Sequence, residues 1–376
     1  MIKIMKALLL FFIFIVSFSY AQIVNGISVL SVSTDGKYAI SGNDNNNVYL
    51  WNLEDKTHKQ VNKGKVNSFQ GHANKYSVGF IEGTNIYFYQ DSISNEVFIV
   101  DAEADKEIKR FNPKFQAYGA AINKDMTRYA ASEDKGIIHV INMENPEKYR
   151  EVGRASVSFS GTGKLFQPHF TPDQKYIVAT NGGGELWILD AQTGKLLQDI
   201  IKNVGQTSNA ISPNGDYVIT VDSGHLGVKY NFNGRQIKRF FLTIPNNKEV
   251  NTDSIRGGTT SINFIDDENV IVTWHSIKNG FEYVSLSNPD EIKASEDYGV
   301  KHYLAPIKYL PLIEKPNAEY PSMDGLYPQT QSYMPVVATS PEKHILVMAQ
   351  ANGSGIMVYK FDPDDQILKL IWSPEL

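Results

Sequence analysis

Residues Pro168–Ile200 read PHFTPDQKYIVATNGGGELWILDAQTGKLLQDI. Short runs of β-branched and aromatic residues alternate here with clusters of Pro, Asp, Asn and Gly, a pattern typical of strands joined by tight turns. Starting at Gln167, the stretch predicts four short strands in a row. One such sheet of about 40 residues cannot bury both of its faces alone, so it needs neighbours of the same kind.

The pattern recurs along the whole chain. The first residue of the second strand falls near Tyr38, Ile86, Tyr129, Tyr176, Tyr217, Val270 and His344. These positions lie 41 to 53 residues apart, except for a last spacing of 74. A period in the forties with four strands per unit is the signature of a propeller. The sequence therefore predicts an all-β, seven-bladed β-propeller of four-stranded antiparallel blades.

The turns and strand endings resemble those of a known family. Leu50-Trp51-Asn52-Leu53 closes a third strand, and Gly71-His72 precedes the second unit. Both features resemble WD-repeat β-propellers, and the resemblance covers nearly all of the chain after residue 21. In that family a His, a Ser or Thr, an Asp and a Trp are hydrogen-bonded, and Ser41, Asp44 and Trp51 are the corresponding residues of the first unit. Quinoprotein-like and lactonase-like propellers are the alternatives.

The front of the chain has the features of a signal peptide. Lys3 and Lys6 precede the apolar run Ala7–Val16, and small residues lead up to Ala21. We expect residues 1–21 to be removed and 22–376 to form a single propeller domain, exported to the periplasm or secreted. An uncleaved N-terminal anchor is the alternative. We expect no integral membrane segment after signal cleavage, because no later apolar run is long enough.

The composition argues against one class of partner and excludes disulfide bonds as a source of stability. The chain has 36 basic and 41 acidic residues and no cysteine. The acidic excess argues against nucleic acid as a partner. Without disulfides, an exported chain must be held by its own core, and the repeated sheets can supply one.

The segment Ala294–Met334 is a Tyr/Pro-rich insertion at 294–334. It separates the sixth unit, which we expect to end at Lys293, from the seventh unit, which we expect to begin at Pro335. As a connection from an outer to an inner strand, it should lie on the same face as the turns between second and third strands. One interpretation is a structural flap that packs on the propeller. A second is an aromatic recognition surface. A third is a mis-read strand or an eighth partial blade. Its candidate binding residues are Tyr298, Tyr303, Tyr309, Tyr320, Tyr327 and Tyr333.

Second turns of neighbouring units carry His225 and His275, which could converge near the channel mouth and join the binding residues. The acidic residues of these turns, Asp91 among them, are expected to shape the turns rather than to bind ligands. His139 and His169 fall within strands, where packing or hydrogen bonding is expected.

Catalytic signatures are missing. There is no Gly-x-Ser-x-Gly elbow and no His-x-x-x-His pair, and Ser158–Lys164 lacks the spacing of a phosphate-binding loop. We therefore expect no catalytic residues, no metal and no cofactor.

The sequence predicts an exported, non-catalytic scaffold that binds another protein through one loop-rich face. The alternatives are a lactonase-like or lyase-like propeller enzyme, or a carbohydrate-binding protein that uses the channel mouth.

Overall fold

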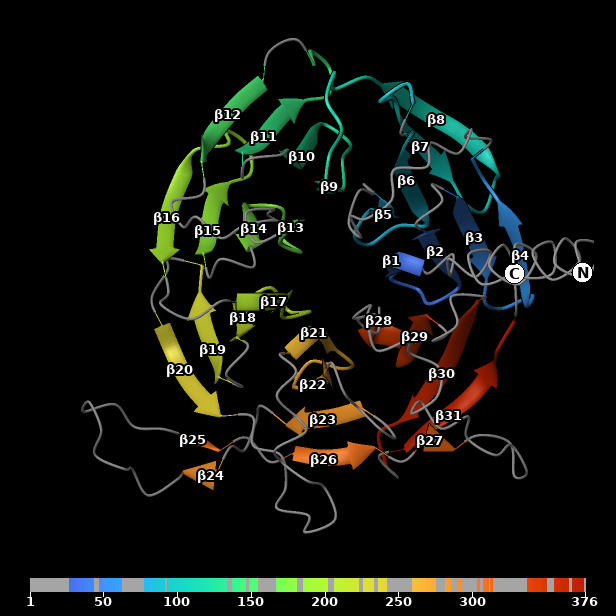
Figure 1. Cartoon of the computed structure of the whole chain (residues 1–376), viewed down its shortest axis with the longest axis vertical. Coiled ribbons are helices and arrows are strands. Elements are labelled where there is room, and N and C mark those ends of the chain that lie inside the picture. The colour runs from blue at the N-terminus through green and yellow to red at the C-terminus, as the bar shows by residue number, and fades with distance from the viewer. Residues whose placement is uncertain are drawn as a thin grey trace, which may run out of the picture.

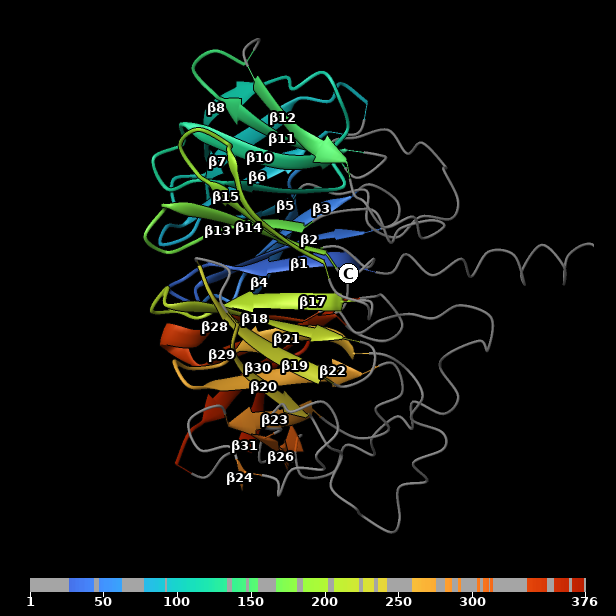
Figure 2. The same cartoon turned by 90° about the vertical axis from the view of Figure 1, so that its left-hand side faces the viewer.

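The computed structural model confirms an all-β propeller of four-stranded antiparallel blades (Figure 1). It describes residues 27–43, 47–62, 78–91, 93–133, 137–146, 149–154, 167–180, 185–201, 206–222, 226–232, 236–241, 259–274, 281–285, 290–291, 303–304, 307–310, 312–313, 337–349, 355–364 and 367–374. The described strands form seven sheets, numbered here 1 to 7 in chain order. Figure 2 shows the ring from its side.

Sheets 1 to 4 each contain four consecutive strands. Sheet 1 holds β1 (Ile27–Val32), β2 (Tyr38–Asn43), β3 (Val48–Asn52) and β4 (Thr57–Gln60), and sheet 2 holds β5 (Val78–Phe80), β6 (Ile86–Gln90), β7 (Val97–Asp101) and β8 (Lys106–Phe111). Sheet 3 holds β9 (Gly119–Ile122), β10 (Arg128–Glu133), β11 (Ile137–Asn142) and β12 (Tyr149–Arg154), and sheet 4 holds β13 (Gln167–Phe170), β14 (Tyr176–Thr180), β15 (Glu185–Asp190) and β16 (Leu196–Ile201). The second strands begin within one residue of the predicted positions.

Sheets 5 to 7 depart from this regular order. Sheet 5 holds β17 (Gln206–Ile211), β18 (Tyr217–Asp222), β19 (Leu226–Asn231) and β20 (Gln236–Phe241), followed at its edge by β25 (Tyr303–Leu304) and β24 (Asp290–Glu291). Sheet 6 holds β21 (Thr259–Phe264), β22 (Asn269–Trp274), β23 (Phe281–Ser285) and β26 (Ile307–Leu310). Sheet 7 holds β28 (Val337–Ser340), the 3-10 turn η5 (Pro341–Lys343), β29 (Ile345–Ala349), β30 (Ile356–Asp362) and β31 (Ile367–Trp372), with β27 (Leu312–Ile313) at its edge.

Apolar clusters between neighbouring sheets form the core. Separate clusters join sheets 1 and 2, 2 and 3, 3 and 4, 4 and 5, and 6 and 7. Between sheets 5 and 6, the rings of Tyr217 and Phe264 meet edge to face with centroids 6.0 Å apart. Each sheet therefore covers one face of the next, as the sequence pattern requires.

Packing between sheets 7 and 1 closes the ring. Trp51 is fully buried in a cluster that also contains Val347 and Val358, and its ring lies 6.2 Å from that of Trp372. The Trp51 indole N–H donates to Ser41 Oγ at 2.8 Å, which is the Ser–Trp link expected from the WD-repeat resemblance. Among the described residues, sheets 1 and 7 share no strand, and side-chain packing together with the hydrogen bond from Ser340 Oγ to Thr34 O joins them.

The turns between first and second strands in sheets 1 and 4 share one hydrogen-bond pattern. In sheet 1, Ser33 Oγ donates to Asp35 Oδ1 at 2.7 Å and accepts the Tyr38 N–H at 3.0 Å. In sheet 4, Thr171 and Asp173 repeat this arrangement. These side chains satisfy the turn's own backbone donors and fix where the second strand begins.

These turns also bond across sheets. Thr34 Oγ1 accepts the Gly83 N–H of sheet 2 at 2.8 Å, and Ser340 Oγ of sheet 7 donates to Thr34 O at 2.6 Å. Gly36 has a φ of 69° and lies against Lys343, so a side chain at this position would be both strained and crowded. Polar contacts therefore join the first turn of sheet 1 to sheets 2 and 7.

The Tyr/Pro-rich segment takes a different course from the expected one. The expectation placed the fourth strand of unit 6 before Lys293, but β26 takes that position from within the insertion, with Ile307 paired to Val284. β25 pairs with β20, and β27 pairs with β31, both in parallel. Prolines disfavour central strands but are tolerated at the ends of edge strands, which explains the difference. The described part of the segment therefore follows the outer edges of sheets 5, 6 and 7 (Figure 1).

Outer strands carry β-bulges. Ile108 is skipped in the β7–β8 pairing, Leu197 in β15–β16 and Ile371 in β30–β31. All three are exposed. A bulge twists an edge strand and hinders further pairing along it, which agrees with the two-residue length of the β27 pairing on β31.

We predict that acid destabilises the protein through the first turns. Burial alone would raise the pKa of Asp35, Asp125 and Asp173, but hydrogen bonds, led by those from Ser33, Thr127 and Thr171, lower the pKa of each carboxyl group. Their stabilisation is therefore complete above the unfolded-state pKa of about 3.9 and is lost as pH falls through the lowered folded values.

Urea denaturation measured between about pH 6 and pH 2 checks this expectation. The free energy of unfolding should fall with pH in the wild type and fall less in the triple variant Asp35→Asn/Asp125→Asn/Asp173→Asn. Equal slopes for the two proteins would show that these carboxylates do not carry the acid sensitivity.

Candidate interaction face

Two sets of turns project from the ring, one on each side. We call the side with the turns between first and second strands the first-turn face. The second-turn face carries the turns between second and third strands together with the connections from outer to inner strands. The most fully described loops of this face are the β6–β7 turn at 91–96, without residue 92, and the β8–β9 connection at 112–118. Asn112 Nδ2 donates to Ser94 O at 2.8 Å, so these two loops meet on one face as predicted.

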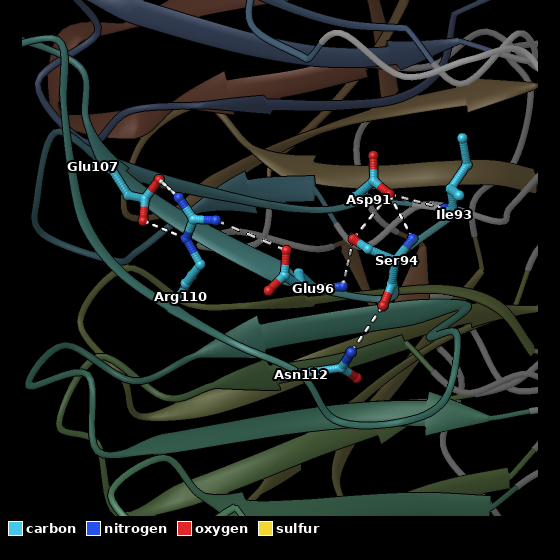
Figure 3. Close-up of polar contacts among 7 residues, drawn as sticks. All are labelled: Asp91, Ile93, Ser94, Glu96, Glu107, Arg110 and Asn112. Carbon is cyan, nitrogen blue, oxygen red and sulfur yellow. Dashed lines mark hydrogen bonds and ion pairs between the residues drawn. The ribbon is translucent and has the colours of Figure 1, made fainter.

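Asp91 shapes the β6–β7 turn (Figure 3). Its Oδ1 accepts the N–H groups of Ile93 and Ser94 at 2.9 and 2.7 Å, and the Ser94 hydroxyl at 3.0 Å. Asn95 takes the left-handed conformation with a φ of 59°, which asparagine tolerates well. The predicted role of Asp91, to shape the turn, is confirmed.

Gln90 ties the turn to the connection. Its buried amide Nε2 donates to Asn95 O at 3.0 Å and to Phe115 O at 2.7 Å, while Oε1 accepts the Ala117 N–H at 2.8 Å. One side chain thus satisfies backbone groups of both loops. This arrangement fixes their relative position, because leaving such buried groups unpaired is costly.

Phe115 anchors the connection on sheet 3. Its ring lies 4.3 Å from that of His139, whose Nε2 is 2.7 Å from Glu133 Oε2. His139 is buried, so its expected role in packing and hydrogen bonding is confirmed. The platform formed by the β6–β7 turn and the β8–β9 connection therefore rests on two sheets.

An ion-pair network flanks the platform (Figure 3). The Arg110 guanidinium donates to both carboxylate oxygens of Glu107 at 2.7 and 2.8 Å and lies 3.9 Å from Glu96. It also covers the Phe98 ring at 4.9 Å, and Phe98 stacks on Tyr89 at 5.1 Å. Burial raises the pKa of Tyr89 to about 12, so this tyrosine stays neutral. The network lies along the outer part of sheet 2 and is exposed to solvent.

Most of the predicted binding residues lie outside the described part of the chain. These are Tyr298, Tyr320, Tyr327, Tyr333, His225 and His275. The other two lie on the outer edge: Tyr303 of β25 pairs with Phe240, and Tyr309 of β26 pairs with Glu282. Their role in binding stays a prediction.

His169 differs from its expected packed role. Its side chain on the innermost strand of sheet 4 is exposed to solvent. The surrounding protein atoms still desolvate the imidazole, and this desolvation lowers its pKa. Among the described residues, no three His, Cys, Asp or Glu side chains are grouped so as to hold a metal ion. The same part of the chain contains no helix with the length and apolarity needed to cross a membrane.

Sequence reasoning missed the platform. The text DSISNE at Asp91–Glu96 is a recognisable turn, but nothing in it indicates that Gln90 and Asn112 bind this turn to the next connection. An isoleucine at a turn tip was the one available signal, because turn positions favour small and polar residues.

Comparisons with known proteins agree with the fold. No family model matches the chain, and no curated protein matches it. Among solved structures, Kluyveromyces lactis Hsv2 is 13% identical, with 93% of this chain and 99% of that chain covered and a TM-score of 0.56. The Myceliophteria thermophila Cps50 (Swd1) β-propeller domain is 12% identical, with 90% and 98% covered and a TM-score of 0.56. A chain of the mitotic checkpoint complex is 12% identical, with 93% and 87% covered and a TM-score of 0.56.

Similarity at this level of identity defines the fold. Together with the Ser41–Trp51 hydrogen bond and the radial sheets, it shows that the chain is a WD-repeat-like β-propeller.

We predict that Gln90→Ala separates the turn from the connection. The substitution leaves the Ala117 N–H and the Phe115 carbonyl without their side-chain partner, so we expect the free energy of unfolding to fall by about 2–3 kcal/mol. Chemical denaturation measures this loss. Hydrogen exchange at the Ala117 amide should become faster in the variant.

Gln198→Ala is the matched control, because Gln198 is exposed on the outer strand β16. This control should change stability by less than about 0.5 kcal/mol. Unchanged exchange at Ala117 in the Gln90 variant would contradict the assigned role of Gln90.

Proposed function

We propose that this chain is an exported, non-catalytic, seven-bladed propeller that acts as a protein–protein interaction scaffold through its second-turn face. The seven described sheets and the packing of sheet 7 on sheet 1 support the blade number. The basic and apolar text of Met1–Ala21 supports export, to the periplasm or to the medium.

The platform on the second-turn face is the observation that carries the proposal. The ring uses the faces of its sheets for its own core, so partners must meet turns, connections or outer strands. Gln90, Asp91 and Asn112 hold the β6–β7 turn and the β8–β9 connection in one arrangement. Loops that are already ordered lose little conformational entropy when they bind a partner.

The similar structures add support of a general kind. One of the similar chains comes from a structure of the mitotic checkpoint complex and is therefore part of an assembly. A propeller of this fold can thus work as a component that other molecules contact, and we extend this role to the present chain.

A test of the face uses the absence of cysteine. A single cysteine replaces exposed Lys114 on the second-turn face, or exposed Lys175 on the first-turn face, and is coupled to a bulky polyethylene glycol maleimide. The partner is first captured from cell extract on immobilised residues 22–376, then identified and purified. Its affinity should fall by about tenfold or more with the label at 114 and change little with the label at 175.

Equal loss of affinity at both positions would contradict the assignment of the face. Export has its own readout. The N-terminus of the native protein should be Gln22, and a protein that retains Met1 in the cytoplasm would contradict this part of the proposal.

A further inference from the structure

Most of the described outer strands carry features that hinder the pairing of a further strand. The β-bulges of β8, β16 and β31 recur in β12, where Gly153 is skipped, and in β20, where Ile237 is skipped. β26 has no bulge, but Pro306 precedes it and Pro311 follows it. Bulges and prolines are common means by which edge strands avoid unwanted partners.

β4 is the described outer strand that has neither feature (Figure 1). Its four residues, Thr57–Gln60, pair with β3 in an unbroken antiparallel register, and all four side chains are exposed. The charge of Lys59 could protect this edge, but Lys59 Nζ lies 2.5 Å from Asp105 Oδ2 of sheet 2 and is already paired. In the described part of the chain, β4 therefore keeps an open edge along its whole length.

The hydrogen bonds between β3 and β4 determine which backbone groups face this open edge. Val61, directly after β4, donates its N–H to Val48 O at 2.8 Å. Bonded and non-bonded pairs alternate along an antiparallel ladder, so Lys59 also bonds to β3. The N–H and C=O groups of His58 and Gln60 therefore point away from β3. Donors and acceptors in this order match the backbone of another polypeptide strand.

Two other sheets of this protein already bind a strand at the outer edge. β25 pairs with β20, and β27 pairs with β31, each in parallel and over two residues. Both pairings stay on one side of the bulge in the strand that they join. Because β4 has no bulge, it can pair over its whole length. The four added residues are apolar or aromatic: Tyr303, Leu304, Leu312 and Ile313.

The surroundings of β4 indicate which side chains a paired strand would carry. The His58 ring lies 4.9 Å from that of Trp51, on the side of sheet 1 that faces sheet 7. Lys59 and Asp105 lie on the other side, towards sheet 2. Successive residues of a strand point to opposite sides, so a strand beside β4 places its side chains alternately near aromatic and near charged groups. Its matching sequence alternates apolar residues with polar ones.

A second copy of this chain fits the edge poorly. The register that bonds His58 of one copy to Gln60 of the other uses all the outward groups of β4. This register places the two Lys59 side chains directly opposite each other, and opposed like charges destabilise a sheet.

We propose that the open edge of β4 binds an extended segment of a partner protein, which becomes an additional strand of sheet 1. The backbone of the segment bonds to His58 and Gln60, its apolar residues lie beside His58, and its polar residues lie beside Lys59. This site lies on the outer edge of the ring, apart from the second-turn face, and goes beyond the proposed function.

The test uses a phage-displayed library of random short peptides as the probe, selected on immobilised 22–376. His58→Pro removes the outward N–H of the edge, and the matched control His58→Ala keeps this N–H but removes the same ring. We expect the selected peptides to alternate apolar and polar residues. Synthetic copies should bind His58→Pro about tenfold or more weakly than wild type, and His58→Ala within about threefold.

Amide hydrogen exchange in the wild type is the second measurement and needs no variant. The His58 and Gln60 amides should exchange fast in the free protein and slowly with a selected peptide bound, whereas the Lys59 amide should be slow in both states. Three results would overturn the site and leave the second-turn face untouched: a library without binders, equal binding to His58→Pro, or unchanged exchange at His58. A wild-type dimer in sedimentation that His58→Pro dissociates would replace the partner segment by a second copy.

Discussion

Every sheet in this structure must be packed against a neighbour on both of its faces, and this requirement determines the fold. A four-stranded antiparallel sheet with apolar residues on both of its faces is stable only when it packs between two other sheets. The buried side chains accordingly group between sheets rather than within them, as at Trp51 between sheets 7 and 1 or Trp187 between sheets 3 and 4. A ring satisfies this need without leaving an uncovered face. The same packing leaves turns, connections and outer strands as the surfaces on which function can act.

Hydrogen bonds between sheets fix the positions of the turns on this apolar ring. Thr34 bonds to sheet 2 through Gly83 and to sheet 7 through Ser340, so one first turn joins three sheets. On the opposite side, Gln90 joins a turn of sheet 2 to the connection that leads into sheet 3. Both faces are thus fixed by side chains that bond to backbone groups outside their own turn. The second-turn face combines this rigidity with an exposed apolar tip, which makes it the better candidate for binding.

Much of the fold was predictable from sequence, because period, turn residues and strand composition are local signals. The fourth strand of sheet 6 was not, because β26 follows β23 only after the chain has passed along sheet 5. The site was harder still. The turn role of Asp91 follows from its residue type, but the platform depends on the contacts of Gln90 and Asn112, which are distant in sequence or formed only on folding.

The closure of the ring is the claim on which the account rests, and a disulfide tests it most directly. A Cβ on Gly36 would lie 3.0 Å from Lys343 Cβ, and a disulfide needs a separation of about 3.5–4.5 Å, so the turn must shift outward. The positive φ of Gly36 strains the substituted turn equally in the reduced and the oxidised protein, so the comparison between these two states cancels that strain. The chain has no cysteine of its own. In the variant Gly36→Cys/Lys343→Cys, oxidation should form an intramolecular disulfide and raise the denaturation midpoint above that of the same protein when reduced. Two thiols that stay reactive toward maleimide, or links only between separate chains, would contradict a ring in which sheet 7 meets sheet 1.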